Sequence, residues 1–266
     1  VDKYSHQMVY GEYVIGPQIK LAKRLSELLP DNLQSFYFLN SGSEAVEGAM
    51  KLAKKHTGRG KIVAMRNAYH GSTSGALSMM SDEYYSGPFK PLLPNIHFAE
   101  LNELATLDII DEQTAAVFIE PIQSEKGYIP VTQIFLNALR TKCNETGTLL
   151  VFDEIQSGIG RTGKLYAFEH YNVVPDILLS AKALGGGMPI GVFISSKEIM
   201  KSLSDNPILG HITTFGGHPV SCAAGNAALK FLTTSSLMDE VAEKEALFRE
   251  LLVHPKIKGI SGVGLM

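Results

Sequence analysis

The sequence has little of what several protein classes depend on, beginning with cysteine. Of its 266 residues only Cys143 and Cys222 are cysteines, and they lie far apart in the chain. Two cysteines are too few for a disulfide framework or for a zinc site with four ligands. We therefore expect reduced, buried thiols in a protein of a reducing compartment, and we predict a cytoplasmic location.

Concentrated positive charge and long apolar runs are also absent. The formal net charge is −3 and lysine and arginine are spread along the chain, so we predict no nucleic-acid partner and no binding to an anionic membrane. No apolar run reaches the length of a membrane span, and no signal peptide is recognisable. Apolar residues make up 45% and charged residues 19% of the chain, which is ordinary for a globular protein and excludes a disordered tail protein.

Length and the two ends of the chain bear on its domain organisation. A chain of 266 residues can form one large domain, or one large domain and part of a second. The sequence starts at Val1 without a methionine and stops at Met266 in an apolar stretch, so we expect a segment of a longer chain. Because the helical stretch from Met238 is more polar, we predict a large domain over residues 1–229 and the beginning of a smaller one over residues 230–266.

Short apolar runs with strand character alternate with helical stretches. Apolar residues recur at helical spacing over residues 44–56, and a second helical pattern covers roughly residues 135–146. Continuous apolar strands alternating with helices indicate an α/β fold with a mostly parallel sheet covered by helices. The strand-like runs are residues 36–39, 61–65, 116–119, 149–152, 177–180 and 191–194.

Polar side chains follow four of these runs. In open α/β sheets ligands bind beyond the carboxyl ends of the strands, so the residues at these ends predict a site. They offer an amine, carboxylates, an amide and a hydroxyl-rich turn. These groups are Lys182, Glu120, Asp153, Gln156 and the sequence Ser41-Gly42-Ser43, which opens a helix.

Each group also has a purely structural alternative. Ser41-Gly42-Ser43 could bind an anion at the helix N-terminus, or Ser41 could simply cap the helix with Glu44 in its first turn. Lys182 precedes three glycines and could enter a confined pocket as a nucleophile, or it could be an exposed lysine at a helix start. Asp153 requires a cationic partner, either a protonated pyridine nitrogen or a side chain of a neighbouring helix.

Two nucleotide-binding patterns overlap in residues 158–164, and we reject both. Gly-Ile-Gly-Arg-Thr-Gly matches the dinucleotide fingerprint, but Asp-Glu-Ile-Gln-Ser separates it from the strand, whereas a pyrophosphate turn follows the strand directly and opens a helix. The Gly-x4-Gly-Lys pattern is followed by Leu165, which has no hydroxyl for magnesium. No histidine pair has zinc-ligand spacing, and no Ser-His-Asp arrangement is recognisable, so we predict no metal.

Six stretches carry a more specific pattern, namely residues 40–45, 68–71, 120–125, 153–158, 181–184 and 213–219. In this order they resemble the class III aminotransferases, of the ornithine, acetylornithine or ω type. The resemblance covers essentially the whole chain. It implies an aspartate aminotransferase-like fold (fold type I), the cofactor pyridoxal 5'-phosphate (PLP), and transfer of an amino group between an amine or amino acid and a 2-oxo acid.

The resemblance implies that Lys182 carries PLP as a Schiff base and then removes and returns a proton during transfer. Asp153 is expected to pair with the ring nitrogen, so that the ring accepts electrons. Thr214 resembles the hydroxyl that completes the phosphate site of a partner subunit, which implies a homodimer. The other implied cofactor contacts are Gly42 and Ser43 with the adjacent Ser41 for the phosphate, Tyr69 stacked on the ring beside His70, Gln156 at the phenolic oxygen and Glu120 as a supporting acid near Asp153.

At the substrate end the sequence departs from the family pattern. Glu125 resembles the glutamate that gates the carboxylate site in ornithine-type members. These members usually have an arginine after the aromatic-x-Gly unit, but here this position is Ser72, and a hydroxyl cannot replace a guanidinium. Either the substrate carboxylate is held elsewhere or the donor is a different amine, although the overall similarity favours the acetylornithine and ornithine group.

Other functions on the same scaffold stay open. An aminomutase, a racemase or a decarboxylase would use the same cofactor, because the fold does not fix the reaction. A non-catalytic relative used for binding is a third alternative, but it would have no need for both Lys182 and Asp153.

Overall fold

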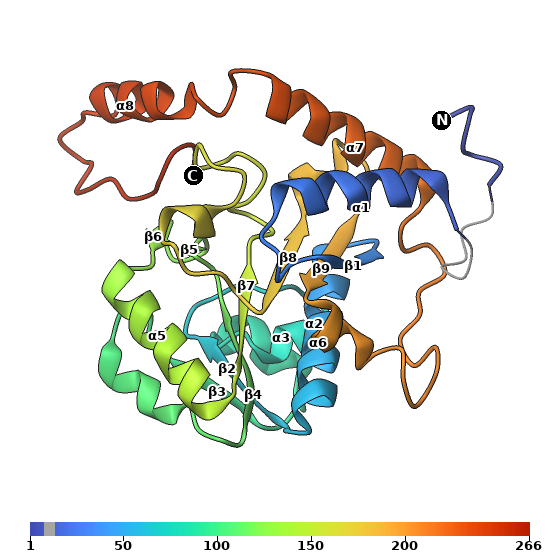
Figure 1. Cartoon of the computed structure of the whole chain (residues 1–266). Coiled ribbons are helices and arrows are strands. Elements are labelled where there is room, and N and C mark those ends of the chain that lie inside the picture. Colours follow the sequence, from blue (N-terminus) through green and yellow to red (C-terminus); the bar gives the residue numbers. More distant parts are fainter. Residues whose placement is uncertain (8–13) are drawn as a thin grey trace.

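The computed structural model describes residues 1–7 and 14–266, which form a sheet between two layers of helices (Figure 1). The seven strands of the sheet are β1 (Ser35–Leu39), β2 (Lys61–Met65), β3 (Ile96–Ala99), β4 (Thr114–Ile119), β7 (Leu149–Asp153), β8 (Ile177–Ala181) and β9 (Gly191–Ser195). Their order is β1-β9-β8-β7-β4-β2-β3. Within this sheet β9 is antiparallel to both neighbours and the other pairs are parallel, as the continuous apolar runs predicted.

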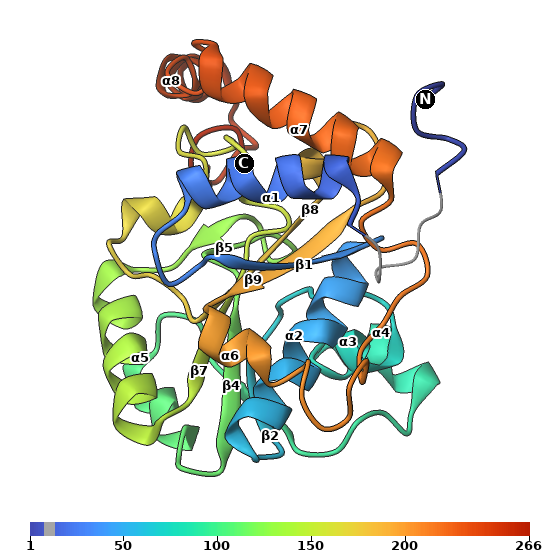
Figure 2. The same ribbon diagram turned by 45° about the vertical axis from the view of Figure 1, so that its right-hand side comes forward.

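Helices cover both faces of the sheet, each over its own apolar cluster. One face carries α1 (Gly16–Leu28), α5 (Gln133–Thr146) and α7 (Pro219–Thr234), and α1 and α7 lie side by side (Figure 2). The opposite face carries α2 (Gly42–Thr57), α3 (Ser74–Ser78) and α6 (Lys197–Lys201). Because successive strand residues point to opposite faces, neighbours such as Val117 and Phe118 of β4 enter different clusters.

Smaller elements connect these layers. Strands β5 (Ile122–Gln123) and β6 (Ile129–Pro130) form a separate antiparallel pair. The remaining helices are α4 (Glu83–Ser86), α8 (Val241–Leu251) and the 3-10 turns η1 (Gly87–Phe89), η2 (Leu104–Ile109), η3 (Ala167–His170) and η4 (Lys182–Gly185).

The start of α2 is fixed by reciprocal capping. The Ser41 hydroxyl accepts a hydrogen bond from the Glu44 N–H at 3.2 Å, and the Glu44 carboxylate accepts one from the Asn40 N–H at 2.6 Å. Two backbone donors at the helix start are satisfied as in a capping box, although the Glu44 carboxylate bonds the N–H of the residue before the N-cap. The helix ends at Gly58, whose φ of 69° lies in the left-handed region that favours glycine. Both ends of α2 are therefore encoded locally.

The predicted domain boundary can be compared with the helices of the C-terminal part of the chain, α7 and α8. The predicted domain boundary between residues 229 and 230 falls within α7, which is continuous from Pro219 to Thr234. Only Val241 of α8 is buried, so this helix packs little against the described residues. The division into a large and a small domain stays a prediction.

Both cysteines are free and lie in the apolar cluster of α5 and α7. Burial raises the pKa of each thiol to about 12, and neither side chain is exposed. We expect Cys143 and Cys222 to resist a thiol-labelling disulfide in the native protein at pH 8 and to react fully in denaturant, because the reagent needs an accessible thiolate. Counting labelled thiols under both conditions checks this. Labelling of either thiol at a rate faster than unfolding would contradict it.

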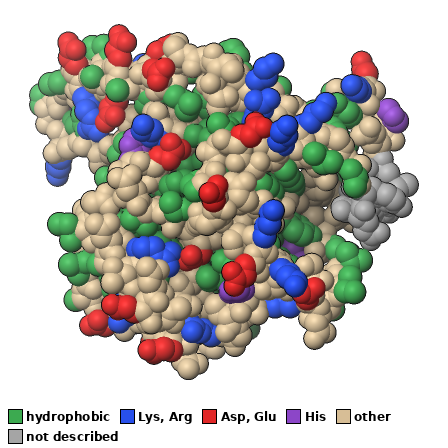
Figure 3. Space-filling model, viewed as in Figure 1, with side chains coloured by type: hydrophobic (Ala, Val, Ile, Leu, Met, Phe, Trp, Pro, Cys, Tyr) green, Lys and Arg blue, Asp and Glu red, His purple; other side chains and the backbone are tan. Residues whose placement is uncertain are grey.

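The surface in Figure 3 shows acidic and basic side chains close to one another over the same face. Among residues 1–7 and 14–266, no helix is both long and apolar enough to cross a membrane.

Candidate active site

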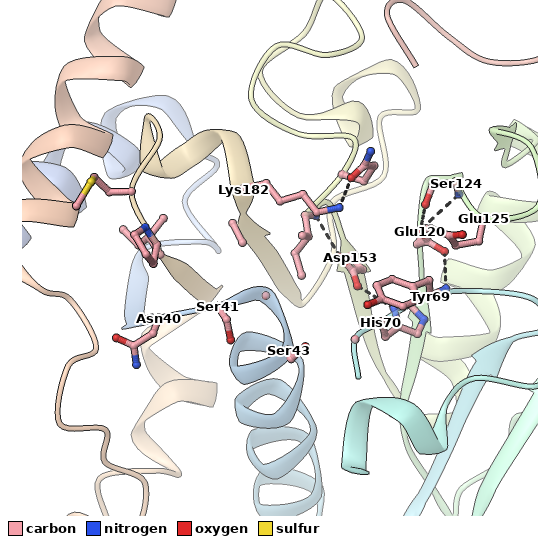
Figure 4. Close-up of a pocket in the computed structure, with 18 residues that line it drawn as sticks. Asn40, Ser41, Ser43, Tyr69, His70, Glu120, Ser124, Glu125, Asp153 and Lys182 are labelled. Atoms are coloured by element: carbon pink, nitrogen blue, oxygen red, sulfur yellow. Dashed lines mark hydrogen bonds and ion pairs between the residues drawn. The ribbon is translucent and has the colours of Figure 1, made fainter. Parts of the chain in front are cut away.

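The strand order brings the predicted site residues together. Strands β1 and β8 both run antiparallel to β9 and are therefore parallel to each other, so β1, β8, β7 and β4 end at the same edge of the sheet. A pocket of about 300 Å³ opens at this edge (Figure 4). Its lining includes every predicted site residue except Ser72 and Thr214, namely Ser41, Gly42, Ser43, Tyr69, His70, Glu120, Glu125, Asp153, Gln156 and Lys182.

Lys182 lies at the turn directly after β8. Its φ of 43° places it in the left-handed region, and the turn directs its amine to Gln156 Oε1, to which it donates a hydrogen bond. The side chain is exposed in this chain. The described residues therefore place the amine in the pocket but do not supply the confinement that the sequence led us to expect.

Asp153 at the end of β7 has a histidine as its partner. Its Oδ2 lies 2.8 Å from His70 Nδ1, and its Oδ1 accepts a hydrogen bond from the Ile155 N–H at 3.1 Å. Both side chains are buried. Burial alone lowers the pKa of His70, but the hydrogen bond and charge of Asp153, together with the charge of Glu120, raise it above its ordinary value. The aspartate thus has a hydrogen-bond partner within the chain, on the loop after β2 and not on a neighbouring helix.

Glu120 joins two walls of the pocket. One oxygen accepts a hydrogen bond from the Tyr69 N–H at 3.1 Å and the other from the Ser124 hydroxyl at 2.9 Å. Burial raises the pKa of Glu120 to about 7, although the charge of His70 and both hydrogen bonds lower it. This carboxyl group therefore holds the loop after β2, which carries Tyr69, against the segment that carries Glu125.

The perturbed Glu120 predicts a pH dependence of stability. Its folded pKa of about 7 exceeds the ordinary value of 4.5, so its contribution to folding is fully present below pH 4.5 and is lost as the pH rises through 7. The loss reaches up to about 3 kcal/mol. We expect Glu120→Gln to remove this component, so that the difference in unfolding free energy between wild type and variant changes by this order between pH 4.5 and pH 8. Denaturant titrations at these pH values measure it, and a constant difference would contradict it.

The turn before α2 is compatible with an anion as well as with a cap. Ser41 caps the helix, as the structural alternative proposed, but the first N–H groups of a helix have no intrahelical acceptor and attract negative charge. Glycine is required at two contacts here, because a Cβ on Gly71 would collide with Ser43 Oγ and one on Gly191 with the Ser41 carbonyl oxygen. The backbone therefore packs closely around this helix start and leaves it open towards the pocket.

Ser72 and Thr214 lie outside the pocket lining. The Ser72 N–H donates to Ser43 Oγ at 3.4 Å, which places this residue beside the helix start. Thr214 lines a different cavity of about 760 Å³ under β1, between α6 and the segment that precedes α7. Its neighbour Thr213 accepts a hydrogen bond from the Asn40 side chain at 3.2 Å.

Some lining residues were not singled out from the sequence. Ser124 lies in the predicted stretch 120–125. Its role was not predicted because the sequence does not show that its hydroxyl donates a hydrogen bond to Glu120. The apolar residues after the three glycines had no polar group to signal a site. The additional lining residues are Asn40, Gly71, Ser124, Ile155, Ala181, Met188, Pro189 and Ile190.

Glu154, next to Asp153, serves the fold and does not line the pocket. Its buried carboxylate accepts hydrogen bonds from the Ala167 N–H at 2.6 Å, the Phe168 N–H at 2.7 Å and the Ser157 hydroxyl at 2.9 Å. These bonds fix the loop over residues 158–164, which consists of turns and opens no α-helix. The rejection of a nucleotide site in this loop agrees with that geometry. No group of three or more metal-ligating side chains is assembled among residues 1–7 and 14–266.

The residues of the pocket fit PLP in chemical type. A primary amine can bind its aldehyde, a buried carboxylate can face its ring nitrogen, and the start of α2 can take its phosphate. A mostly parallel sheet with such a site at its carboxyl edge is typical of PLP-dependent enzymes of fold type I. The pattern of the family "Aminotransferase class-III" matches residues 1–266, and the chain belongs to this family.

Known proteins similar to this chain are aminotransferases. The LysW-aminoadipate semialdehyde/glutamate semialdehyde transaminase of Sulfolobus acidocaldarius is 42% identical over 252 residues, which cover 93% of this chain and 64% of the relative. The acetylornithine aminotransferase of Methanocaldococcus jannaschii is 42% identical over 266 residues, with 96% and 66% covered. The ornithine aminotransferase of Toxoplasma gondii, solved with partial occupancy of PLP at its active site, has a TM-score of 0.88 and 30% identity, with 97% of this chain and 64% of that chain covered.

These comparisons confirm the predicted family and fold. Class III aminotransferases depend on PLP. The chain spans 64% of the length of the first relative, so it corresponds to about two thirds of such an enzyme.

Proposed function

We propose that this chain is the PLP-binding part of an aminotransferase, which moves an amino group between an amine or amino acid and a 2-oxo acid. The observation that carries the proposal is the placement of Lys182, Asp153 and the start of α2 around one pocket. Family membership and the similarity to known aminotransferases support it.

The residues divide the work of such a reaction. Bound PLP supplies an aldehyde for the substrate amine and a protonated ring that withdraws electrons. Lys182 would hold the cofactor through Nζ, and the same amine would serve as the base and acid that moves the substrate proton. Asp153 keeps the ring nitrogen protonated, because a buried carboxylate stabilises a positive charge opposite it. Tyr69 lines the same pocket and would stack on the ring.

The remaining polar groups hold the cofactor in place. The N–H groups of Gly42 and Ser43 at the helix start would bind the phosphate. Gln156 accepts a hydrogen bond from the Lys182 amine through Oε1, and its amide would contact the phenolic oxygen of the cofactor. Through its two hydrogen bonds, Glu120 holds the loop that carries Tyr69 against the segment that carries Glu125.

The donor is an ornithine-type substrate, with the amine that reacts at the end of a chain. The similarity to acetylornithine and semialdehyde transaminases supports this group. Glu125 gates the substrate end of the pocket, and Ser72 leaves the carboxylate to be held by another group. An aminomutase, racemase or decarboxylase on this scaffold is the second candidate function.

An absorbance spectrum and a panel of amines and 2-oxo acids test the function. We expect PLP added to the purified protein to give a visible band that differs from that of free PLP. Addition of an amine donor should bleach this band, and addition of a 2-oxo acid should restore it. Turnover that continues without any 2-oxo acid would favour a racemase or decarboxylase, and a protein that does not bind PLP would refute the proposal.

The assembly we propose is a homodimer in which Thr214 completes the phosphate site of the partner subunit. Its position outside the pocket of its own chain supports this. An enforced monomer should then bind PLP poorly, and a fully saturated, active monomer would rule the dimer out. The two free, buried cysteines support a cytoplasmic location.

A further inference from the structure

The segment that carries Thr214 is attached to the rest of the fold through a histidine three residues earlier. The Nδ1 of His211 lies 3.0 Å from the Nζ of Lys51, which belongs to α2. The backbone carbonyl of His211 accepts a hydrogen bond from the hydroxyl of Tyr37, which belongs to β1. Through its side chain and its backbone, His211 thus joins this segment to two elements of the large sheet layer.

The contact with Lys51 requires a neutral imidazole. A lysine ammonium can only donate hydrogen bonds, so Nδ1 of His211 has to accept, and the ring proton then lies on Nε2. Nε2 is buried without a hydrogen-bond partner among the described residues, and the rings of Tyr37 and Phe193 pack against the imidazole with centroid distances of 5.0 and 6.0 Å. An imidazolium ring would therefore point one N–H at a cation and bury the other without an acceptor.

The surroundings of His211 also favour the neutral ring. Burial and the charge of Lys51 lower the pKa of His211 from its ordinary value of 6.5, although the charge of Glu44 raises it. The ring therefore stays neutral until the pH falls below 6.5, and protonation then removes the acceptor of the lysine. The titratable groups on the elements around the ring are Lys51 and Glu44 of α2, Tyr37 of β1, and Lys197 and Lys201 of α6, which line the same cavity as His211.

We propose that His211 is a positioning residue, which holds the segment with Thr214 in place while its ring is neutral and releases it when the ring is protonated. The inference rests on the proposed function, in which Thr214 completes the PLP phosphate site of the partner subunit. Release withdraws one hydroxyl from that phosphate, so the affinity for PLP should fall as the pH drops below 6.5. Complete loss of a hydrogen bond to a charged group weakens binding by roughly tenfold or more.

Dissociation constants for PLP, measured by fluorescence between pH 8 and pH 5, test this dependence. The variant His211→Asn carries an amide oxygen that can take the place of Nδ1 as acceptor and is not protonated in this range. One protonation changes affinity by at most about tenfold per pH unit, so wild type should lose roughly three- to tenfold more affinity than His211→Asn. Titration of PLP and of Glu120 affects both proteins alike and cancels in this ratio.

A second variant removes the contact at every pH. Lys51→Met eliminates the donor, and because Lys51 is exposed, the fold should not depend on it. We expect this variant to bind PLP roughly tenfold more weakly than wild type at pH 8. Lys54→Met is the matched control, since Lys54 lies on the same helix and has no side-chain hydrogen bond among residues 1–7 and 14–266; it should bind PLP within about threefold of wild type.

The outcomes separate this inference from the proposed function. An equal pH dependence of wild type and His211→Asn, or wild-type affinity of Lys51→Met at pH 8, overturns the inference while the proposed function stands. If wild-type protein binds no PLP at any pH, both fail. Should His211→Asn not fold, nitrogen NMR of the wild-type histidines decides: a proton on Nε2 of His211 is expected at pH 8, and a proton on Nδ1 would overturn the inference.

Discussion

Replacement of Lys182 by alanine is expected to slow amino-group transfer by at least roughly a thousandfold, while PLP still binds without a covalent bond. Among the described residues that line the pocket, Lys182 is the one lysine or arginine, so no second amine can take over its work. Its side chain is exposed and makes a single hydrogen bond, to Gln156. The loss should therefore concern chemistry, and the free energy of unfolding should change little.

The measurement combines turnover with a chemical trap. Borohydride treatment of the PLP-loaded wild type, followed by mass spectrometry of its peptides, should find the cofactor on Lys182, and the variant should retain none. Lys164→Ala is the matched control, because Lys164 is also an exposed lysine but lies in the loop fixed by Glu154, outside the pocket. A variant at residue 182 that keeps wild-type turnover, or a trapped cofactor on another lysine, would contradict the assignment.

The central strands could be predicted because a short, unbroken apolar run between two turns is typical of a buried strand. Strands such as β4 and β7 are buried on both faces and show as unbroken apolar runs with turns at each end. Edge strand β3 escaped prediction, since His97 is exposed and only Ala99 is buried, so no apolar run marks it. Helix α1 was missed although Pro17 in its first turn and the four-residue spacing of Leu21 and Leu25 signal it.

The location of the site could also be predicted, but its internal bonds could not. A polar residue directly after a buried strand has to emerge at the sheet edge, which is why Glu120, Asp153 and Lys182 could be assigned to one pocket. Pairing of His70 with Asp153 joins residues 83 positions apart, and it depends on β2, β4 and β7 being neighbours in the sheet. That order is a property of tertiary packing, which no local pattern in the sequence records.

The exposure of Lys182 shows a second limit of sequence reasoning. Three glycines and an apolar strand around a lysine suggest confinement, yet the described residues leave its side chain exposed. Confinement depends on what packs over the turn from distant parts of the structure. A sequence pattern can therefore identify the reactive group without identifying the walls that enclose it.

Asp153→Asn is expected to reduce turnover by roughly a thousandfold, the order found when a preorganised electrostatic contact is removed from a transition state. An amide has nearly the shape of the carboxylate, and its oxygen can still accept the hydrogen bond from the Ile155 N–H. Its NH2 group then faces His70 Nδ1, which accepts that hydrogen bond with its proton on Nε2. The amide carries no charge, however, so the ring nitrogen loses its proton and the ring withdraws electrons weakly. The fold should persist while the chemistry fails.

The comparison with Glu154→Gln isolates this charge effect. Glu154 is an equally buried carboxylate at the next position, but its three hydrogen bonds serve the loop after β7 and it does not line the pocket. Its substitution should therefore lower the free energy of unfolding and leave turnover per folded molecule within about threefold, since a structural bond affects stability and not the barrier. Turnover and denaturant titrations on both variants give the answer. If Asp153→Asn kept wild-type turnover, or if both variants lost turnover in parallel with stability, Asp153 would have no special role at the ring.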